Sequence, residues 1–424
     1  MTGATRTSVQ TTIAAFILCC AATPGTAAEQ AVNSKDIAKY LTEAKELAAG
    51  KRWAAAWAAL EKAERVPDAS PYSKYKIDEF KGSVLTQQHK YAEAGALFEQ
   101  LAKSEAASAE ERSDHLEKAS QLYMSAKQYE KAARAAETAL EKQPKDPVLL
   151  QLAGQSKYLA GDFRGAAARI GQLVAATERK GGQPPEASLQ LLLNSYYQLK
   201  DRQQIAQTWE MLLRHHPKPE YWRNVLDIKS RQPHSKRVDF YYLALKFDVG
   251  MLDDAADYED LALGATDLGL PEDAVRVLET GLRQGVLAGE HEPRFRRMLA
   301  YAQAKTARSP ADVKDLAQQA QRASSGQLDA DIGRIYLGQR MYDQAIAALR
   351  KGLQKGSLEH SDQARIDLGV AYLKSGETQQ ARAAFADVKS DSEWHDLAEL
   401  WSLRANEVAQ PTEQQLQGAP VIKW

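Results

Sequence analysis

Residues 115–146 read HLEKASQLYMSAKQYEKAARAAETALEKQPKD, and this stretch decides the fold class of the chain. Its apolar residues recur at helical spacing, as in a pair of packed helices. The small side chain of Ala132 lets the second helix approach the first closely, while Tyr123 and Tyr129 fill the space around it. Pro144 cannot continue a helix and ends the second one. The stretch therefore predicts a helical hairpin.

The same pattern returns along the chain from about Val32 to Glu407, with a period in the mid-thirties and short Gly, Pro or Asp breaks. The close-packing position is occupied in turn by Ala56, Ala94, Ala132, Ala166, Ile205, Ala274, Ala345 and Ala381. Two gaps between these positions are about two periods long, so each should hold a degenerate helix pair. We place these pairs at Tyr221–Val249 and Pro293–Ala323.

These repeats predict an all-α, right-handed superhelical solenoid of about ten helix hairpins, with a concave and a convex face. Trp394, Leu397 and Trp401 form one apolar stripe that would cover the end of the last repeat, as a C-terminal capping helix. The expected domains are a signal peptide at 1–28, an N-terminal array at 29–217, an irregular helical repeat at 218–254, a C-terminal array at 255–392, the capping helix at 393–406 and a disordered tail at 407–424.

The N-terminal segment has the pattern of an export signal. Arg6 precedes an apolar run from Ile13 to Ala22, and small residues then lead to a cleavage site after Ala28. The run is too short to span a bilayer. We therefore expect an exported, periplasmic protein with no integral membrane insertion after signal cleavage; a retained anchor is the alternative.

Both cysteines, Cys19 and Cys20, lie in this segment, so the mature chain would form no disulfide. A lipoprotein signal needs a small residue just before the modified cysteine, where Leu18 and Cys19 stand here. Lipoprotein anchoring is not expected.

The hairpin of residues 115–146 resembles the tetratricopeptide repeat (TPR) family. The marker positions of that family correspond to Leu116, Ala119, Tyr123, Tyr129, Ala132, Ala136, Ala139 and Pro144. The resemblance implies a fold that holds other proteins and carries no chemistry of its own.

Three further segments resemble one bacterial group of exported TPR proteins, encoded beside the genes of TonB, ExbB and ExbD. They are residues 191–222, 269–287, and 332–353 together with 364–385. The resemblance implies a periplasmic accessory to TonB-dependent outer-membrane transport, with TonB, ExbD or a TonB-dependent receptor as partner. Residues 232–250, QPHSKRVDFYYLALKFDVG, interrupt the regular pattern of that group.

No catalytic or cofactor motif stands in the sequence: there is no GxxxxGK[ST], HExxH or GxSxG, and no metal-spaced Cys/His set. We therefore expect a non-enzymatic protein without cofactor or metal. His215 and His216 are adjacent, so on a helix they point about 100° apart and cannot readily share a metal; a place at a helix end is expected. A net charge of −1 and export argue against nucleic acid as a partner.

Partner binding is expected on the concave face, which the first helix of each hairpin would line. The candidate residues are Gln121, Met124, Gln151, Gln155, Tyr158, Gln190, Asn194, Tyr197 and Gln198. They are mostly neutral amides and tyrosines, which suit hydrogen bonding to a peptide, with Tyr158 and Tyr197 as possible anchors. A solvated face without a ligand is the alternative.

Three other features have both a functional and a structural interpretation. A basic block within residues 214–237 precedes acidic residues at 248–260; it could attract an acidic partner, or the two sets could partly neutralise each other. The aromatic residues Phe240, Tyr241, Tyr242 and Phe247 could form a docking patch, but their spacing favours repeat core. The tail at 410–424 could be a recognition peptide or a disordered end.

The sequence thus predicts a periplasmic protein–protein interaction scaffold, with the TonB system as the leading assignment. An envelope-assembly scaffold, for outer-membrane protein insertion, pili or polysaccharide export, and a peptide-binding holdase chaperone remain the alternatives.

Overall fold

The computed structural model describes residues 34–306 and 310–409, and these residues form 21 α-helices. The signal peptide, both cysteines and the tail from Gln410 lie outside the described residues. The chain divides into two compact units, which meet in sequence at Lys142 and Gln143. Each unit is described by itself.

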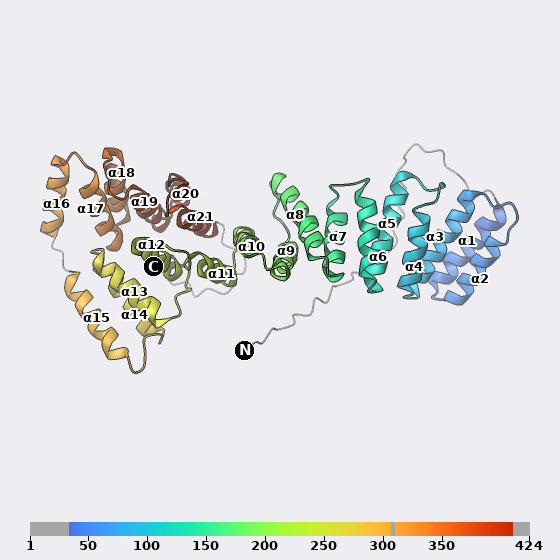
Figure 1. Ribbon diagram of the computed structural model, residues 1–424, viewed down its shortest axis with the longest axis horizontal. Coiled ribbons are helices and arrows are strands. Elements are labelled where there is room, and N and C mark those ends of the chain that lie inside the picture. The colour runs from blue at the N-terminus through green and yellow to red at the C-terminus, as the bar shows by residue number, and fades with distance from the viewer. Residues whose placement is uncertain (1–33, 307–309, 410–424) are drawn as a thin grey trace. The chain divides into compact units, whose positions relative to one another are not determined.

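The first unit consists of three helix hairpins (Figure 1). Their helices are α1 (Lys35–Ala49) with α2 (Trp53–Glu64), α3 (Pro71–Gln87) with α4 (Tyr91–Leu101), and α5 (Ala109–Ser125) with α6 (Tyr129–Leu140). Each hairpin packs on the next through α2 with α3 and α4 with α5. A capping box starts α5: the Ser108 hydroxyl accepts from the Glu111 amide, and the Glu111 carboxylate accepts from the Ser108 amide.

The second unit holds seven further pairs of helices and a last single helix. The pairs are α7 (Pro147–Leu159) and α8 (Phe163–Arg179), α9 (Glu186–Leu199) and α10 (Arg202–His215), α11 (Pro219–Lys229) and α12 (Lys236–Asp248), α13 (Ala255–Asp267) and α14 (Pro271–Arg283), α15 (Glu292–Lys305) and α16 (Pro310–Arg322), α17 (Gln327–Gly338) and α18 (Tyr342–Lys355), and α19 (Ser361–Ser375) and α20 (Thr378–Ala386). The single helix is α21 (His395–Ala409), which packs on α20. The expected all-α class, the ten helix pairs and the terminal capping helix are confirmed.

The close-packing positions explain why the helices pair. All seven predicted alanines are fully buried, from Ala56 in α2 to Ala381 in α20, and Ile205 is half-buried. One turn after the close-packing Ala381, the Phe385 ring of α20 lies against Gly369 of α19, where a Cβ would overlap it. Small residues on one helix and large ones on the other thus set the spacing of the hairpins.

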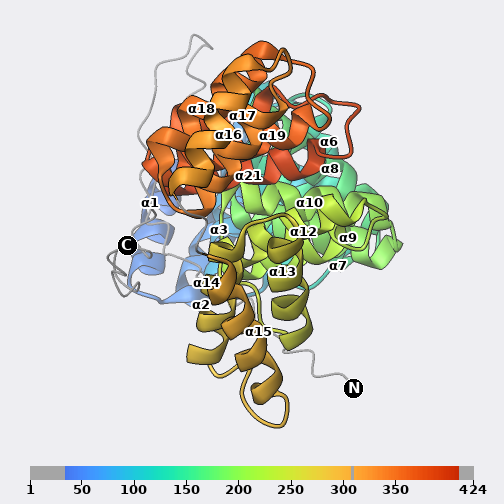
Figure 2. The ribbon, with the colours of Figure 1, turned by 90° about the vertical axis from the view of Figure 1, so that its left-hand side faces the viewer.

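The pairs α11–α12 and α15–α16 depart from this regular packing. Both occupy the positions predicted for degenerate repeats, but the two helices of each pair do not pack closely on each other. Instead α12 packs on α13 and α21, and α16 packs on α17 (Figures 1 and 2). Because α10 also packs on α11, residues 218–254 are built into the second unit, and the described chain has no unit boundary near 217.

The capping helix has the expected stripe. Trp394, Leu397 and Trp401 are buried, and the Trp401 ring stacks on that of Phe385 with centroids 6.2 Å apart. The helix extends to Ala409, beyond the expected end at residue 406. The aromatic residues Phe240, Tyr241 and Tyr242 are buried and Phe247 is half-buried, which confirms the core interpretation.

Candidate protein-binding face

The candidate face lies on α7 and α9, the first helices of two successive hairpins in the second unit. Helix α7 begins at Pro147, and the side chain of Asp146 caps it by accepting from the amides of Val148 and Leu149, at 2.9 Å each. On α7, Gln151, Gln155 and Tyr158 are spaced four and three residues apart, which places them on one side of the helix.

Helix α9 repeats this arrangement with Gln190, Asn194 and Tyr197. The helices α7 and α9 pack on each other, and the Ser188 hydroxyl donates to Oε1 of Gln151 at 2.7 Å. The structure therefore brings seven of the nine predicted residues together on two neighbouring helices.

Most of the predicted side chains are accessible. Gln155, Gln190, Asn194 and Gln198 are exposed, while Gln151 and Tyr158 are half-buried. Gln190 also donates to the Tyr221 hydroxyl of α11 at 3.1 Å, so the polar strip continues onto a third helix. An exposed row of amides offers both donors and acceptors to the backbone of a bound chain.

The two tyrosines are held in place by neighbouring aromatic residues. The Trp209 indole donates to the Tyr197 hydroxyl at 3.0 Å, yet 47% of Tyr197 stays exposed. The Tyr158 ring meets the ring of Phe163 edge-on, with centroids 5.4 Å apart. Fixed aromatic side chains lose little conformational entropy when they bind, so both are suited to act as anchors.

Exposed aliphatic side chains on α7 were missing from the predicted face. Val148 and Leu159 are about half-exposed, and the helical spacing puts both on the same stripe as Gln155. The sequence signal was available, because residues 148, 155 and 159 are seven and four apart. These side chains add apolar contact area to the amide-rich strip.

A carboxylate marks the edge of this face toward α11. Glu186 accepts from Lys218 Nζ at 2.6 Å and from the Tyr221 hydroxyl. Burial opposes the ionisation of Glu186, but these two donors outweigh it and lower its pKa below the usual value. The charge is thus satisfied internally, and the strip beside it remains neutral.

Gln121 and Met124, the other two predicted residues, belong to α5 in the first unit. Gln121 is exposed and donates to Glu117 on its own helix at 2.9 Å, whereas Met124 is half-buried against the Tyr123 core. Both residues are therefore described within the first unit alone.

The histidine pair has structural partners at a helix end, as expected. His215 is the last residue of α10 and bonds Glu178 at 2.8 Å; His216 bonds the carbonyl of Pro184 at 2.8 Å. Over residues 34–306 and 310–409, no group of three His, Cys, Asp or Glu side chains is arranged for a metal ion. The helices of the same ranges also include none with the length and hydropathy that a membrane crossing requires.

Comparison with known proteins supports the repeat assignment for the C-terminal hairpins. The model of the tetratricopeptide repeat family matches residues 336–406, from the end of α17 to α21. No curated protein matches the sequence.

Three solved structures that match the chain do so at low sequence identity and with TM-scores below 0.5. A tetratricopeptide repeat protein from Parabacteroides merdae is 14% identical, over 80% of this chain and 99% of that one, with a TM-score of 0.35. The yeast Sti1 TPR2AB domain in complex with an Hsp90 peptide is 14% identical, over 69% and 98%, with a TM-score of 0.24. Naa15/Naa10 bound to HypK is 13% identical, over 88% and 67%, with a TM-score of 0.36.

Proposed function

We propose that this protein is a periplasmic, non-enzymatic scaffold that holds an extended or helical segment of another protein on the face formed by α7 and α9. The observation that carries the proposal is the exposed strip of Gln155, Asn194 and Gln198 with the ordered anchor Tyr197. A neutral strip with regularly spaced amides recognises the backbone of a partner, and its aromatic and aliphatic residues take up apolar side chains.

We assign the partner to the TonB–ExbB–ExbD system, as TonB, ExbD or a TonB-dependent receptor. The support is the resemblance of residues 191–222, which include α9 and α10, to exported TPR proteins of that system. Export itself rests on the signal-like segment at residues 1–28.

The test is affinity capture from cross-linked cells with three versions of the full chain. The face variant Gln155→Ala/Asn194→Ala/Gln198→Ala removes three exposed amides from α7 and α9. The matched control Gln172→Ala/Gln203→Ala/Gln207→Ala removes three exposed amides from α8 and α10.

We expect the wild type and the control to recover TonB, ExbD or a TonB-dependent receptor, and the face variant to recover at least about tenfold less. Equal recovery by the face variant and the control variant would show that the α7–α9 face does not bind the partner. Recovery of pilus, polysaccharide-export or outer-membrane-assembly components alone would assign the scaffold to envelope assembly instead. Binding of unfolded model substrates without sequence preference would indicate a holdase.

A further inference from the structure

Helices α13 and α15 are neighbours in the second unit, and both pack on α14 (Figures 1 and 2). Arg294, near the start of α15, binds Glu259, near the start of α13, so the two helices run in the same direction. The Tyr258 ring of α13 lies against Gly281 of α14, and Phe295 of α15 is buried in the same core. The sides of α13 and α15 that point away from α14 therefore form one face, which we call the α13–α15 face.

The exposed side of α13 carries an acidic stripe, which consists of Asp260, Leu263 and Asp267. These residues are three and four positions apart, so they follow one side of the helix. All three are exposed, and Leu263 stays 45% accessible. Within residues 34–306 and 310–409, neither carboxylate forms a hydrogen bond or an ion pair. Helix α13 contains no basic residue that could neutralise them.

The exposed side of α15 carries a basic stripe, which consists of Arg297, Tyr301 and Lys305. The residues are four positions apart and all are exposed, with Tyr301 57% accessible. Lys305 Nζ lies 5.5 Å from the centroid of the Tyr301 ring, whereas Arg297 has no polar partner in the part of the chain that the structure describes. After Glu292, helix α15 contains no carboxylate.

The other charges of the α13–α15 face are paired with each other. Arg294 and Glu259 neutralise each other between the two helices. Arg296 binds Glu292 of its own helix at 2.6 Å. On this face of the described helices, the charges that remain for an external partner are therefore those of the two stripes.

The two stripes have the same order and opposite sign: each places an apolar side chain between two like charges. The carboxylates of Asp260 and Asp267 are about 10.5 Å apart along the helix axis, and the cations of Arg297 and Lys305 about 12 Å. A partner that is only acidic or only basic would match one stripe and be repelled by the other. The complementary partner therefore presents a basic and an acidic stripe side by side, as this chain does itself.

We propose that the α13–α15 face is a self-association surface, and that its partner is a second copy of this chain in a two-fold symmetric dimer. A two-fold axis perpendicular to the face sets α13 of each copy antiparallel to α15 of the other, so both contacts form at once. Because each stripe has like charges at its two ends, the antiparallel order keeps every acid opposite a base. Leu263 of one copy then meets Tyr301 of the other.

The size of the face sets the expected affinity. Helices of 13 and 14 residues cover a patch of about 20 by 20 Å. Such a patch is at the low end of specific interfaces, so we expect a Kd of about 10–100 μM. The α13–α15 face shares no residue with the α7–α9 face, so either proposal can fail without the other.

Charge reversal in the full chain tests the proposal by sedimentation velocity. The α15 variant, Arg297→Glu/Lys305→Glu, makes both stripes acidic, and the α13 variant, Asp260→Lys/Asp267→Lys, makes both stripes basic. Each variant alone should associate at least about 100-fold more weakly than the wild type, because four attractive contacts in the dimer become repulsive.

The matched control is Lys314→Glu/Arg350→Glu, which reverses two exposed cations on α16 and α18. The control and the wild type should dimerise alike at about 0.05 M salt, and about 0.5 M salt should weaken both dimers at least about tenfold. A wild type that stays monomeric at about 500 μM, or a dimer that salt leaves unchanged, would overturn the proposal.

Mixing the two stripe variants separates the proposed geometry from a loss of folding. In a mixed dimer, the acidic α15 of one copy faces the basic α13 of the other, and the second contact has the same match in reverse. We therefore expect the equimolar mixture to dimerise with a Kd within about threefold of the wild type. Undiminished association of either variant alone, or a mixture that stays monomeric, would contradict the two-fold arrangement.

Discussion

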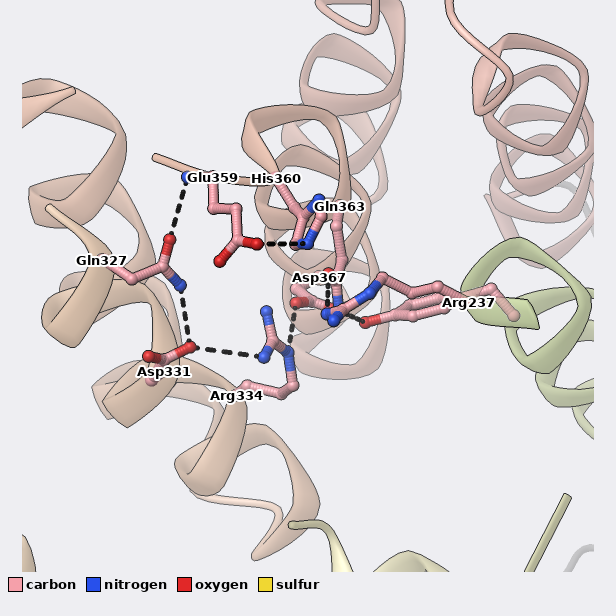
Figure 3. Close-up of polar contacts among 9 residues, drawn as sticks. Arg237, Gln327, Asp331, Arg334, Glu359, His360, Gln363 and Asp367 are labelled. Atoms are coloured by element: carbon pink, nitrogen blue, oxygen red, sulfur yellow. Dashed lines mark hydrogen bonds and ion pairs between the residues drawn. The ribbon is translucent and has the colours of Figure 1, made fainter. Parts of the chain in front are cut away.

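Replacing Asp367 of α19 tests a buried polar network in the second unit. Its carboxylate accepts from Arg334 Nε of α17 at 3.0 Å (Figure 3) and from the Tyr241 hydroxyl of α12. Asp367 is 1% exposed, and Arg334, its ionic partner on α17, is 8% exposed. Burial raises the pKa of Asp367, while the hydrogen bonds from Arg334 and Tyr241 oppose that rise. Asp367→Asn keeps the size of the side chain but removes the charge that compensates the buried guanidinium.

We expect this substitution to cost about 3 kcal/mol of local stability at pH 7, since breaking a buried ion pair from one side leaves the other charge uncompensated. Asp331→Asn is the matched control. Asp331 binds the same guanidinium at 3.4 Å, but its side chain is 42% exposed, so its loss should cost less than about 1 kcal/mol. Joint replacement, Arg334→Met/Asp367→Leu, should recover at least half of the loss, because it leaves no unpaired charge.

Native-state hydrogen exchange of α17 and α19 measures these local stabilities directly. The amides of α1–α6, in the first unit, are the internal reference and should not respond. A loss below about 1 kcal/mol for Asp367→Asn, or a loss equal to that of Asp331→Asn, would refute the role given to the buried pair.

Three further predictions concern packing and pH. In the first unit, burial lowers the pKa of His115, whose Nε2 lies 2.7 Å from the Tyr75 hydroxyl. The stability of α3–α6 should therefore fall as the pH drops below about 6.5. His115→Leu should abolish that pH dependence in thermal melts. In the second unit, burial opposes the ionisation of Asp248, but the ion pairs with Lys374 and Arg404 outweigh burial and lower the pKa of Asp248. The contribution of Asp248 to stability should be full above about pH 4 and lost in stronger acid. Asp248→Asn should remove this contribution from acid denaturation curves. Gly369→Ala should lower the free energy of unfolding by about 1–3 kcal/mol, because the new Cβ overlaps the Phe385 ring. Gly171→Ala on α8, where a Cβ meets nothing within 4 Å, should raise it by about 0.5–1 kcal/mol. Urea titrations measure both changes, and equal effects of the two substitutions would contradict the packing account.

The helix pairs were predictable because each depends on local chemistry. An alanine at a fixed offset, a large residue on the facing helix and a break after the pair occur within one repeat, so Ala132 and Ala381 could be identified as buried without any tertiary information. The cap followed in the same way from the spacing of Leu397 and Trp401. Such short-range patterns repeat, and repetition makes them visible in one sequence.

The contact of α21 with α11 and α12 could not be predicted from one sequence. Trp222 and Glu407 are 185 residues apart, and Ser235 and Glu393 are 158 apart, so no periodicity connects them. The basic block was visible, and the sequence left open whether it attracts an acidic partner or is partly neutralised by the acidic residues at 248–260. That Asp396 of the same chain pairs with Lys229 of this block depends on the tertiary arrangement of the helices, which single-sequence patterns do not specify.

The binding face was predictable only in part. Helical spacing placed Gln155 and Asn194 on the first helices of their hairpins, where the structure has them exposed. Gln121 and Met124 belong to the first unit, which is described apart from the unit that holds α7 and α9. The predicted role in binding remains a prediction for all nine residues.

Site-specific photo-cross-linking in living cells tests the central claim most directly. A photoreactive amino acid at Gln155 or Asn194 would sit on the proposed α7–α9 face, and one at Gln172 or Gln207 would sit on α8 or α10 as the control. We predict a discrete adduct with one partner protein, a component of the TonB system, from the two face positions and none from the two controls. Adducts of equal yield from all four positions, or from the controls alone, would contradict the account.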